Sequence, residues 1–514
     1  MKRPQLISKG TINRLLQSAD EARSRGDFNG VIEALERASR LDPANPTLLL
    51  HLGHACGSYF DYAAAAQAFD RAIRIASNKA EAFSAAGTRA RDFGNNAMAE
   101  NYFRRALEQK DVSADTLIAL AEISERQSRL EEAAKLADRA MRLKPNFPAA
   151  LLVRARLKRQ AGQFDDAEKI LLSFPSDASR ELQSRAHYER GSILDRLGRY
   201  DDAMAAFVSA KALLAPEAAP HLAGARQVRT QLNELRITLT PEILKRWHDF
   251  KNELQPLHRL ALLCGHPRSG TTLLEQVLDS HPDIVSAEET NIFHDNAYPL
   301  LTRNAPMDAT VLSVLESASA GTLKEARANY FCIVEKFLGK PIAGRLLVDK
   351  NPILTFLIAP FVRIFPEAKL LVALRDPRDV CLSCFMQPLP LNQSAAAYLT
   401  LEDTVEDYVA LMSMYQTLSP QLLNEHLEVR YEDLVEDLES VSRKVLGFLG
   451  VAWNERVLRF DEHARQKLVR SPTYADVTKP VFKHAVGRWH HYQKHLEPHL
   501  DKLSPFAKAF GYEV

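Results

Sequence analysis

The first half of the chain repeats itself at a nearly constant step. Short turns of similar sequence begin at Gly26, Phe60, Gly94, Ser128, Gly162 and Gly198. The first four steps between these positions are 34 residues long and the last is 36. A pattern that recurs at a fixed step of this length predicts a solenoid, in which each unit packs only against its neighbours.

Small or β-branched residues hold fixed places around each turn. Five residues after the turn starts stand Val31, Ala65, Ala99, Ala133, Ala167 and Ala203. Twelve residues after the turn starts stand Ala38, Ala72, Ala106, Ala140, the exception Phe174, and Ala210. Seven residues before the turn starts stand Ala19, Gly53, Gly87, Ala121, Ala155 and Gly191. Small side chains at these steps predict pairs of closely packed antiparallel helices, and Pro43 and Pro145 are expected to end the second helix of their pairs.

These residues resemble the tetratricopeptide repeat, a helix–turn–helix unit of 34 residues. The resemblance implies an all-α solenoid of about six repeats over residues 10–215. Its concave surface would bind a protein or peptide partner. A spacer, or an arm that forms a homodimer, is the alternative.

Composition restricts the function classes. The 66 Lys and Arg residues nearly balance 65 Asp and Glu residues, which gives a net charge of +1. The chain therefore has no overall positive electrostatic potential of the kind that attracts nucleic acid. Any anion site must therefore be local. Five cysteines cannot form a disulfide framework in 514 residues, and no run of about 18 apolar residues occurs. We expect a cytoplasmic protein without membrane insertion.

After residues 216–257, which we expect to be capping or linker helices, the pattern changes. Apolar runs predict strands at Leu260–Cys264, Leu346–Val348, Leu370–Leu374 and Leu427–Val429. Helical sequence follows each of them, at Thr272–Ser280, Ile353–Phe365, Pro377–Phe385 and Leu434–Leu449. Strands that alternate with helices predict a three-layer α/β domain with a parallel sheet over residues 258–514, whose ligand crevice lies at the carboxyl ends of the strands.

The first predicted strand runs into a glycine-containing loop, GHPRSGTT, from Gly265 to Thr272. Its glycine spacing matches the phosphate-binding loop of nucleotide triphosphatases, but Thr271 stands where that motif has lysine. Backbone N–H groups of such a loop face an anion. Arg268 adds a planar donor pair that suits phosphate or sulfate.

The segment from Pro267 to Thr290 resembles the 5′-phosphosulfate-binding region of sulfotransferases, and its Glu-Glu-Thr end is most similar to tyrosylprotein sulfotransferases. The resemblance implies a P-loop-like fold that binds 3′-phosphoadenosine 5′-phosphosulfate (PAPS) and releases adenosine 3′,5′-bisphosphate (PAP). It implies that the 5′-phosphosulfate is bound by Arg268, Ser269, Gly270, Thr271 and Thr272, and the 3′-phosphate by Arg375 and Ser383.

Further similarities extend to about residue 495. Lys350 resembles the transition-state lysine of the family, and Tyr431 resembles a tyrosine that contacts the nucleotide. Thr473 stands in place of a catalytic serine, and Arg488 in place of a lysine that binds the 3′-phosphate. Gln387 replaces a family arginine, which weakens one cofactor contact.

The reaction implied is transfer of a sulfuryl group from PAPS to an acceptor hydroxyl, with no metal required. Glu289 is placed like the general base of the family, and Glu288 is expected to be a structural or substrate-orienting neighbour. Lys350, Thr473, Arg268 and the loop N–H groups would stabilise the charge that develops on the bridging oxygen. The Glu-Glu-Thr match favours a protein or peptide tyrosine as acceptor, and sugars and small molecules, which the same fold family also sulfates, are the alternatives. The repeats would recruit the acceptor or a partner.

Two other functions remain open. A nucleotide kinase or GTPase is disfavoured because the loop lacks its lysine. A non-catalytic interaction scaffold with a degenerate nucleotide site is disfavoured by the presence of Glu289, Lys350, Arg375 and Ser383. The Cys381–Cys384 pair and the spacing of His491, His495 and His499 do not predict a metal site, because no further ligands accompany them and Pro498 breaks the helix. We expect the carboxy-terminal segment to be solvated.

Overall fold

The computed structural model describes residues 3–24, 26–254, 258–306, 308–388, 392–466 and 485–513. Contacts divide the chain into two compact units, of which the first contains residues 1–157 and 329–340 and the second contains residues 158–328 and 341–514. The domain boundaries expected at residues 215 and 258 stay a prediction. Among the described residues, no helix is long and apolar enough to cross a lipid bilayer.

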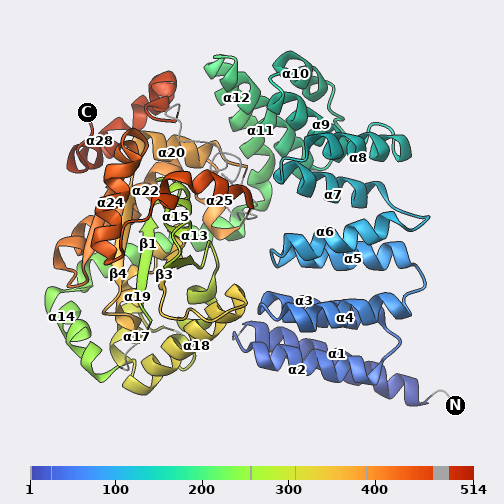
Figure 1. The fold of residues 1–514 in the computed structure, drawn as a ribbon, viewed down its shortest axis with the longest axis horizontal. Coiled ribbons are helices and arrows are strands. Elements are labelled where there is room, and N and C mark those ends of the chain that lie inside the picture. The colour runs from blue at the N-terminus through green and yellow to red at the C-terminus, as the bar shows by residue number, and fades with distance from the viewer. Residues whose placement is uncertain are drawn as a thin grey trace. The chain divides into compact units, whose positions relative to one another are not determined.

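The first unit is built from paired helices (Figure 1). They are α1 (Arg3–Ser24), α2 (Phe28–Leu41), α3 (Pro46–Ser58), α4 (Tyr62–Ile75), α5 (Lys79–Asp92), α6 (Asn96–Leu107), α7 (Ala114–Arg126) and α8 (Leu130–Leu143). Helix α9 (Pro148–Gln160) crosses into the second unit. Helices α2 and α8 each end two residues before the prolines predicted to stop them.

The repeated turns share one backbone conformation. All six residues that begin the turns have a positive φ, between 60° and 81°. Glycine adopts this left-handed conformation freely, and it ends a helix by turning the chain away. The next residue then caps the following helix in three of the turns, where the side chains of Asp27, Asp61 and Asn95 accept a hydrogen bond from a backbone N–H three residues on.

Close helix contact explains the small residues of the pattern. A β-carbon at Gly53 would lie 2.4 Å from the Phe69 ring, and one at Gly87 would lie 2.7 Å from the Phe103 ring. The alanines that follow the turns are fully buried between the helices, as Ala65, Ala72, Ala99, Ala106, Ala133 and Ala140 show. The predicted solenoid is therefore confirmed, and its spacing reflects helix packing.

The second unit begins with repeat helices and continues into an α/β domain (Figure 1). Its elements up to the second strand are α10 (Phe164–Leu172), α11 (Arg180–Arg196), α12 (Tyr200–Leu214), η1 (Ala215–Glu217), α13 (Ala219–Thr238), α14 (Pro241–Asp249), η2 (Phe250–Glu253), β1 (Leu260–Gly265), α15 (Thr271–Asp279) and β2 (Ile284–Ser286). The next are η3 (Phe293–Ala297), α16 (Pro299–Thr302), α17 (Val311–Ser317), α18 (Ala320–Leu338), whose end belongs to the first unit, β3 (Leu346–Lys350), η4 (Pro352–Thr355), α19 (Ile358–Ile364) and β4 (Lys369–Leu374). The last are α20 (Pro377–Phe385), α21 (Gln393–Ala396), α22 (Leu401–Leu418), η5 (Ser419–Gln421), β5 (His426–Arg430), α23 (Tyr431–Glu436), α24 (Leu438–Leu449), η6 (Glu455–Arg459), α25 (Phe460–Gln466), η7 (Arg488–Tyr492), α27 (Gln493–Leu496), η8 (Glu497–His499) and α28 (Leu500–Ala509).

The described strands form one parallel sheet in the order β2-β3-β1-β4-β5. Helices α15, α24 and α25 pack on one face, where their apolar residues form a core with Ala261, Leu263, Leu371 and Ala373. The alternate residues Leu262, Leu370 and Val372 are fully buried on the opposite face. The predicted three-layer α/β fold is thus confirmed, with β2 as a short fifth strand.

Two predicted helices are interrupted. The helix predicted over 434–449 divides into α23 and α24, because the Asp437 side chain accepts a hydrogen bond from Ser440 N–H at 3.0 Å and starts a new helix. The helix predicted over 353–365 begins as the 3₁₀ turn η4. The Thr355 hydroxyl lies in this turn and hydrogen-bonds both the N–H and the C=O of Gly265, at 2.8 and 2.7 Å.

The last repeat packs against the α/β domain within the second unit. Tyr188, Phe207 and their neighbours on α11 and α12 share a buried cluster with Leu382 and Phe385 of α20 and with Trp489 and other residues of η7 and α27. The prediction of a solvated carboxy-terminal segment is therefore wrong for its apolar residues, because they cover the end of the solenoid.

Candidate active site

The predicted site residues follow the carboxyl ends of the strands. All described strands of the sheet run parallel, so these ends meet at one edge of the sheet. In spatial order across the sheet the residues are Glu289 after β2, Lys350 at the end of β3, Arg268 after β1, Arg375 after β4 and Tyr431 after β5. The topology therefore brings residues from positions 268 to 431 into one row.

The loop after β1 turns sharply into α15. Gly265 and Gly270 have φ values of 134° and 91°, and Arg268 adopts a left-handed φ of 73°, which is rare for a residue with a side chain. A β-carbon would lie 2.3 Å from the Ala373 carbonyl oxygen at Gly265 and 2.5 Å from the Tyr431 ring at Gly270. No side chain caps α15 at Gly270, so the helix presents its first N–H groups at the loop.

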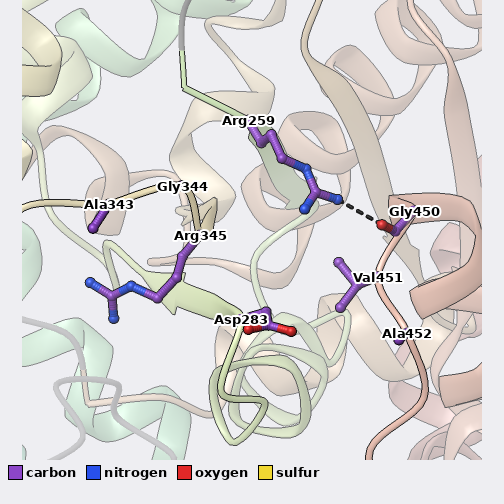
Figure 2. A pocket seen from close by; sticks show the side chains of 8 residues that line it. All are labelled: Arg259, Asp283, Ala343, Gly344, Arg345, Gly450, Val451 and Ala452. Atoms are coloured by element: carbon purple, nitrogen blue, oxygen red, sulfur yellow. Dashed lines mark hydrogen bonds between the residues drawn. The ribbon is translucent and has the colours of Figure 1, made fainter.

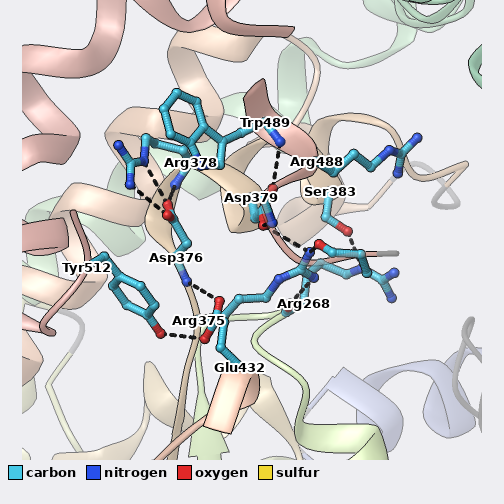
Figure 3. Close-up of polar contacts among 12 residues, drawn as sticks. Arg268, Arg375, Asp376, Arg378, Asp379, Ser383, Glu432, Arg488, Trp489 and Tyr512 are labelled. Carbon is cyan, nitrogen blue, oxygen red and sulfur yellow. Dashed lines mark hydrogen bonds and ion pairs between the residues drawn. The ribbon is translucent and has the colours of Figure 1, made fainter. Parts of the chain in front are cut away.

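Arg268 and Ser383 meet beside this loop (Figure 3). Arg268 Nε donates a hydrogen bond to Ser383 Oγ at 3.0 Å. Arg375 reaches the same loop, because its Nη1 donates to the Arg268 carbonyl oxygen at 3.3 Å. The structure therefore brings together the predicted ligands of the two phosphate positions, two cationic and one hydroxyl-bearing.

The Arg375 guanidinium is held on several sides. Its Nη2 donates to the Ala485 carbonyl oxygen at 2.5 Å and lies 3.6 Å from an Asp379 oxygen, and the group lies 4.9 Å from the centre of the Tyr431 ring. The buried Nε has no hydrogen-bond partner among the described residues. A preoriented arginine with a buried donor to spare suits an oxyanion.

Lys350 forms the other half of the site. Its ammonium lies 2.6 Å from Glu289 Oε1, 2.9 Å from Glu275 Oε2 and 3.5 Å from Thr272 Oγ1. Burial lowers the pKa of Lys350, but the two carboxylates raise it more, so the pKa lies above its ordinary value. Lys350 therefore stays charged, and it places an ammonium beside Thr272, next to the position where the loop has Thr271 in place of a lysine.

The two carboxylates around Lys350 differ in exposure. The Glu275 side chain is 1% exposed and also accepts a hydrogen bond from Ser286 Oγ, whereas the Glu289 side chain is 27% exposed. Only Glu289 can therefore reach an incoming molecule. Sequence reasoning missed Glu275 because a glutamate within a helix reads as a surface residue. Its place between the apolar residues Leu274 and Val277 was an available signal for its burial, but not for its contact with Lys350.

Two predicted residues, Arg488 and Gln387, have contacts with the last repeat. Arg488 Nη2 pairs with Asp195 of α11 at 2.8 Å, and Tyr492 donates to the same carboxylate at 2.6 Å. Gln387 follows α20, and its carbonyl oxygen accepts a hydrogen bond from Lys211. Thr473 lies outside the described residues.

Cys381 and Cys384 are buried, and burial raises the pKa of Cys384 to about 12, as expected for core thiols.

A hollow at the opposite edge of the sheet is unrelated to this row (Figure 2). Its lining includes Arg259, Asp283 and Arg345, which directly precede β1, β2 and β3. Arg259 donates to the Gly450 carbonyl oxygen at 2.8 Å. The amino ends of parallel strands lie far from the carboxyl edge where ligands of such sheets bind.

A buried acid, Asp407 of α22, lies beside the phosphate loop, with a carboxylate oxygen 3.9 Å from Nε2 of His266. Burial raises the pKa of Asp407 to about 7. The folded protein therefore binds a proton that the unfolded chain releases near pH 4, and the stability that this gives is lost as the pH rises through 7. Because of Asp407, the free energy of unfolding of the wild type should fall by about 2 to 3 kcal/mol between pH 5 and pH 8, and Asp407→Asn should lack this fall.

Urea unfolding followed by tryptophan fluorescence measures this effect, because Trp247, Trp453 and Trp489 all lie in the second unit. Glu402→Gln changes an exposed carboxylate of the same helix and serves as the control. Parallel pH profiles for the wild type and Asp407→Asn would contradict the assignment.

Comparison with known proteins identifies both parts of the chain. Residues 261–455 match the model of the Sulfotransferase family. Tetratricopeptide-repeat models match residues 16–80, 84–148, 126–186 and 184–213. The chain carries a sulfotransferase-family domain after tetratricopeptide repeats. The matched segment of the sulfotransferase domain contains the whole row from Arg268 to Tyr431.

Other known proteins are similar to this chain at low identity. An uncharacterized protein of Aquifex aeolicus is 24% identical over 81% of this chain and 54% of its own length. The protein-tyrosine sulfotransferase of Drosophila melanogaster is 27% identical over 49% of this chain and 52% of its own length. The chain thus spans about half the length of these curated relatives. A solved sulfotransferase domain from the Synechococcus PCC 7002 olefin synthase is 22% identical, covers 51% of this chain and 97% of its own, and has a TM-score of 0.39.

Proposed function

We propose that the sulfotransferase domain transfers a sulfuryl group from PAPS to the hydroxyl of a protein or peptide tyrosine. The observation that carries the proposal is the order of groups along the carboxyl edge of the sheet. Glu289 follows β2, Lys350 ends β3, the phosphate loop follows β1, and the anion-binding residues Arg375 and Ser383 follow β4. This order separates an acceptor side from a nucleotide side.

The residues present fit the donor. Arg375 has a buried N–H without a described partner, and Arg268 and Ser383 lie beside it. We assign the 3′-phosphate to Arg375 and Ser383, and the 5′-phosphosulfate to the loop from Arg268 to Thr272. PAPS supplies a sulfuryl group whose bond to the 5′-phosphate oxygen breaks as the acceptor oxygen bonds to sulfur.

The side chains of the acceptor half perform the proton and charge steps. Glu289 takes the proton of the acceptor hydroxyl as that oxygen attacks. Lys350 lies between Glu289 and Thr272, so it stabilises the charge left on the bridging oxygen. Its contact with buried Glu275 holds the ammonium in place while Glu289 changes its protonation state. Thr473 is proposed to assist Lys350.

The acceptor class is proposed from the Glu-Glu-Thr sequence after β2 and from the names of the relatives. Several relatives are protein-tyrosine sulfotransferases, from 24% to 27% identical. The repeats support a peptide or protein acceptor, because solenoids of this kind present extended surfaces to partners. We propose that they recruit the acceptor or a protein that delivers it.

Calorimetric titration with PAP, with magnesium and with EDTA, tests the nucleotide assignment. We expect micromolar binding that does not depend on magnesium. Transfer of labelled sulfate from PAPS to tyrosine-containing peptides, compared with the same peptides carrying phenylalanine, then tests the acceptor. Failure of the folded protein to bind PAP would favour the scaffold alternative, and magnesium-dependent binding of ATP or GTP in its place would favour a kinase or GTPase.

A further inference from the structure

Lys211 is a buried lysine in the last turn of α12, the final repeat helix. Its side chain is 5% exposed and lies beside the aromatic rings of Tyr188 and Phe385, 5.3 and 5.6 Å from their centres. Its ammonium makes one long hydrogen bond, 3.4 Å, to the carbonyl oxygen of Gln387. The repeat therefore places a cation against the helix that carries Ser383.

Among the described residues, this cation has no counter-ion. Of the two lysines buried in the described part of the chain, Lys350 contacts two carboxylates, whereas no described carboxylate lies within 4 Å of Lys211. An ammonium without a partner is costly to bury. Burial accordingly lowers the pKa of Lys211 to about 7. An anion that enters the site would remove this cost.

Lys211 lies near the residues proposed to bind the phosphates, Arg268, Arg375 and Ser383. Arg268, Lys211 and Arg375 all act on the Cys384 thiol and lower its pKa against the larger effect of burial. Cys384 directly follows Ser383, and its Sγ lies 3.4 Å from the Pro267 carbonyl oxygen in the phosphate loop. Arg268 contacts Ser383, and Lys211 contacts Phe385 and Gln387, so both cations lie at the carboxyl end of α20.

We propose that Lys211 binds the phosphate held by Arg375 and Ser383, so that the last repeat completes the nucleotide site of the sulfotransferase domain. This inference rests on the proposed function, which assigns that position to the 3′-phosphate. Gln387, the residue whose carbonyl oxygen Lys211 contacts, carries no charge of its own, so Lys211 supplies the third cation there. The repeats would then contribute to donor binding and not to recruitment alone.

Calorimetry with PAP and with adenosine 5′-monophosphate, which lacks the 3′-phosphate, tests this role. We expect Lys211→Met to weaken PAP binding about 10- to 100-fold, because a hydrogen bond to a charged group is lost, and to leave binding of the monophosphate unchanged. Methionine is unbranched and apolar, so it suits the site between Tyr188 and Phe385. Lys494→Met is the matched control, because Lys494 lies on the nearby α27 and is 62% exposed.

Proton uptake gives a second readout. The titratable groups facing Lys211 from the packed elements are Tyr188 of α11 and Cys384 of α20. A phosphate raises the pKa of a facing ammonium, so at pH 8 the wild type should take up between about half and one proton per PAP bound. Titrations in Tris and HEPES, which differ in ionisation enthalpy, measure this uptake, and Lys211→Met should lack it.

The outcomes separate the two proposals. If wild type binds PAP and Lys211→Met binds it equally well, Lys211 is a structural residue and the proposed function stands. Equal weakening for both nucleotides would also overturn the assignment to the 3′-phosphate. If wild type does not bind PAP at all, the proposed function fails, and the role of Lys211 fails with it.

Discussion

Glu289→Gln is expected to lower kcat about 10³-fold, within the range for removal of a general base, and to leave the affinity for PAP unchanged. Glutamine has the same shape as glutamate, and its amide oxygen can accept the hydrogen bond that Lys350 now donates to Glu289. It cannot take a proton from the acceptor hydroxyl. Transfer of labelled sulfate to a tyrosine peptide measures kcat, and calorimetry measures PAP binding.

Glu275→Gln shows whether Glu289 acts as a base or only positions Lys350. Glu275 contacts the same ammonium but is fully buried, so it cannot reach the acceptor hydroxyl. Glu275→Gln should therefore lower stability and leave kcat much closer to the wild-type value than Glu289→Gln does. A kcat of Glu289→Gln within threefold of wild type would show that another group is the base.

Arg375→Ala is expected to weaken PAP binding about 10- to 100-fold, the effect of losing hydrogen bonds to a charged group. Binding of adenosine 5′-monophosphate should change little, because Arg375 is assigned to the 3′-phosphate. Calorimetry with both nucleotides measures the difference. The difference between the two nucleotides, and not the loss alone, identifies the phosphate that Arg375 contacts.

Arg375 also supports the local structure, since it contacts the Ala485 carbonyl oxygen and Asp379. Arg375→Lys therefore accompanies the alanine variant, because it keeps the charge while it loses the planar donor pair. We expect an intermediate affinity for PAP. Equal weakening for both nucleotides would indicate a disturbed loop, and unchanged PAP binding in the folded alanine variant would overturn the assignment.

The repeats could be predicted almost completely, because local rules produce them. Each turn needs a residue that tolerates a positive φ, and glycine fills four of the six positions. Phe60 and Ser128 adopt the same conformation without being glycine, and the period of the pattern identified them where residue type did not. Neighbouring helices contact each other at short sequence separation, so the spacing of small residues is sufficient.

The row of site residues was predictable for a related reason. Each of Arg268, Glu289, Lys350, Arg375 and Tyr431 stands at or just after the end of an apolar run, and a parallel sheet brings such ends together. The partners of these residues were not predictable. Glu275 beside Lys350 depends on how α15 packs on the sheet, which no pattern in its own segment specifies.

By itself, the sequence determined the solenoid, the parallel α/β domain and the residue types at the strand ends, because period, alternation and turn chemistry act over short distances along the chain. The tertiary structure alone decided that the last repeat meets the α/β domain. Asp195 pairs there with Arg488, and Lys211 lies against the end of α20, contacts that join residues 293 and 176 positions apart. Such contacts depend on how two independently patterned surfaces pack together, and neither pattern encodes the other.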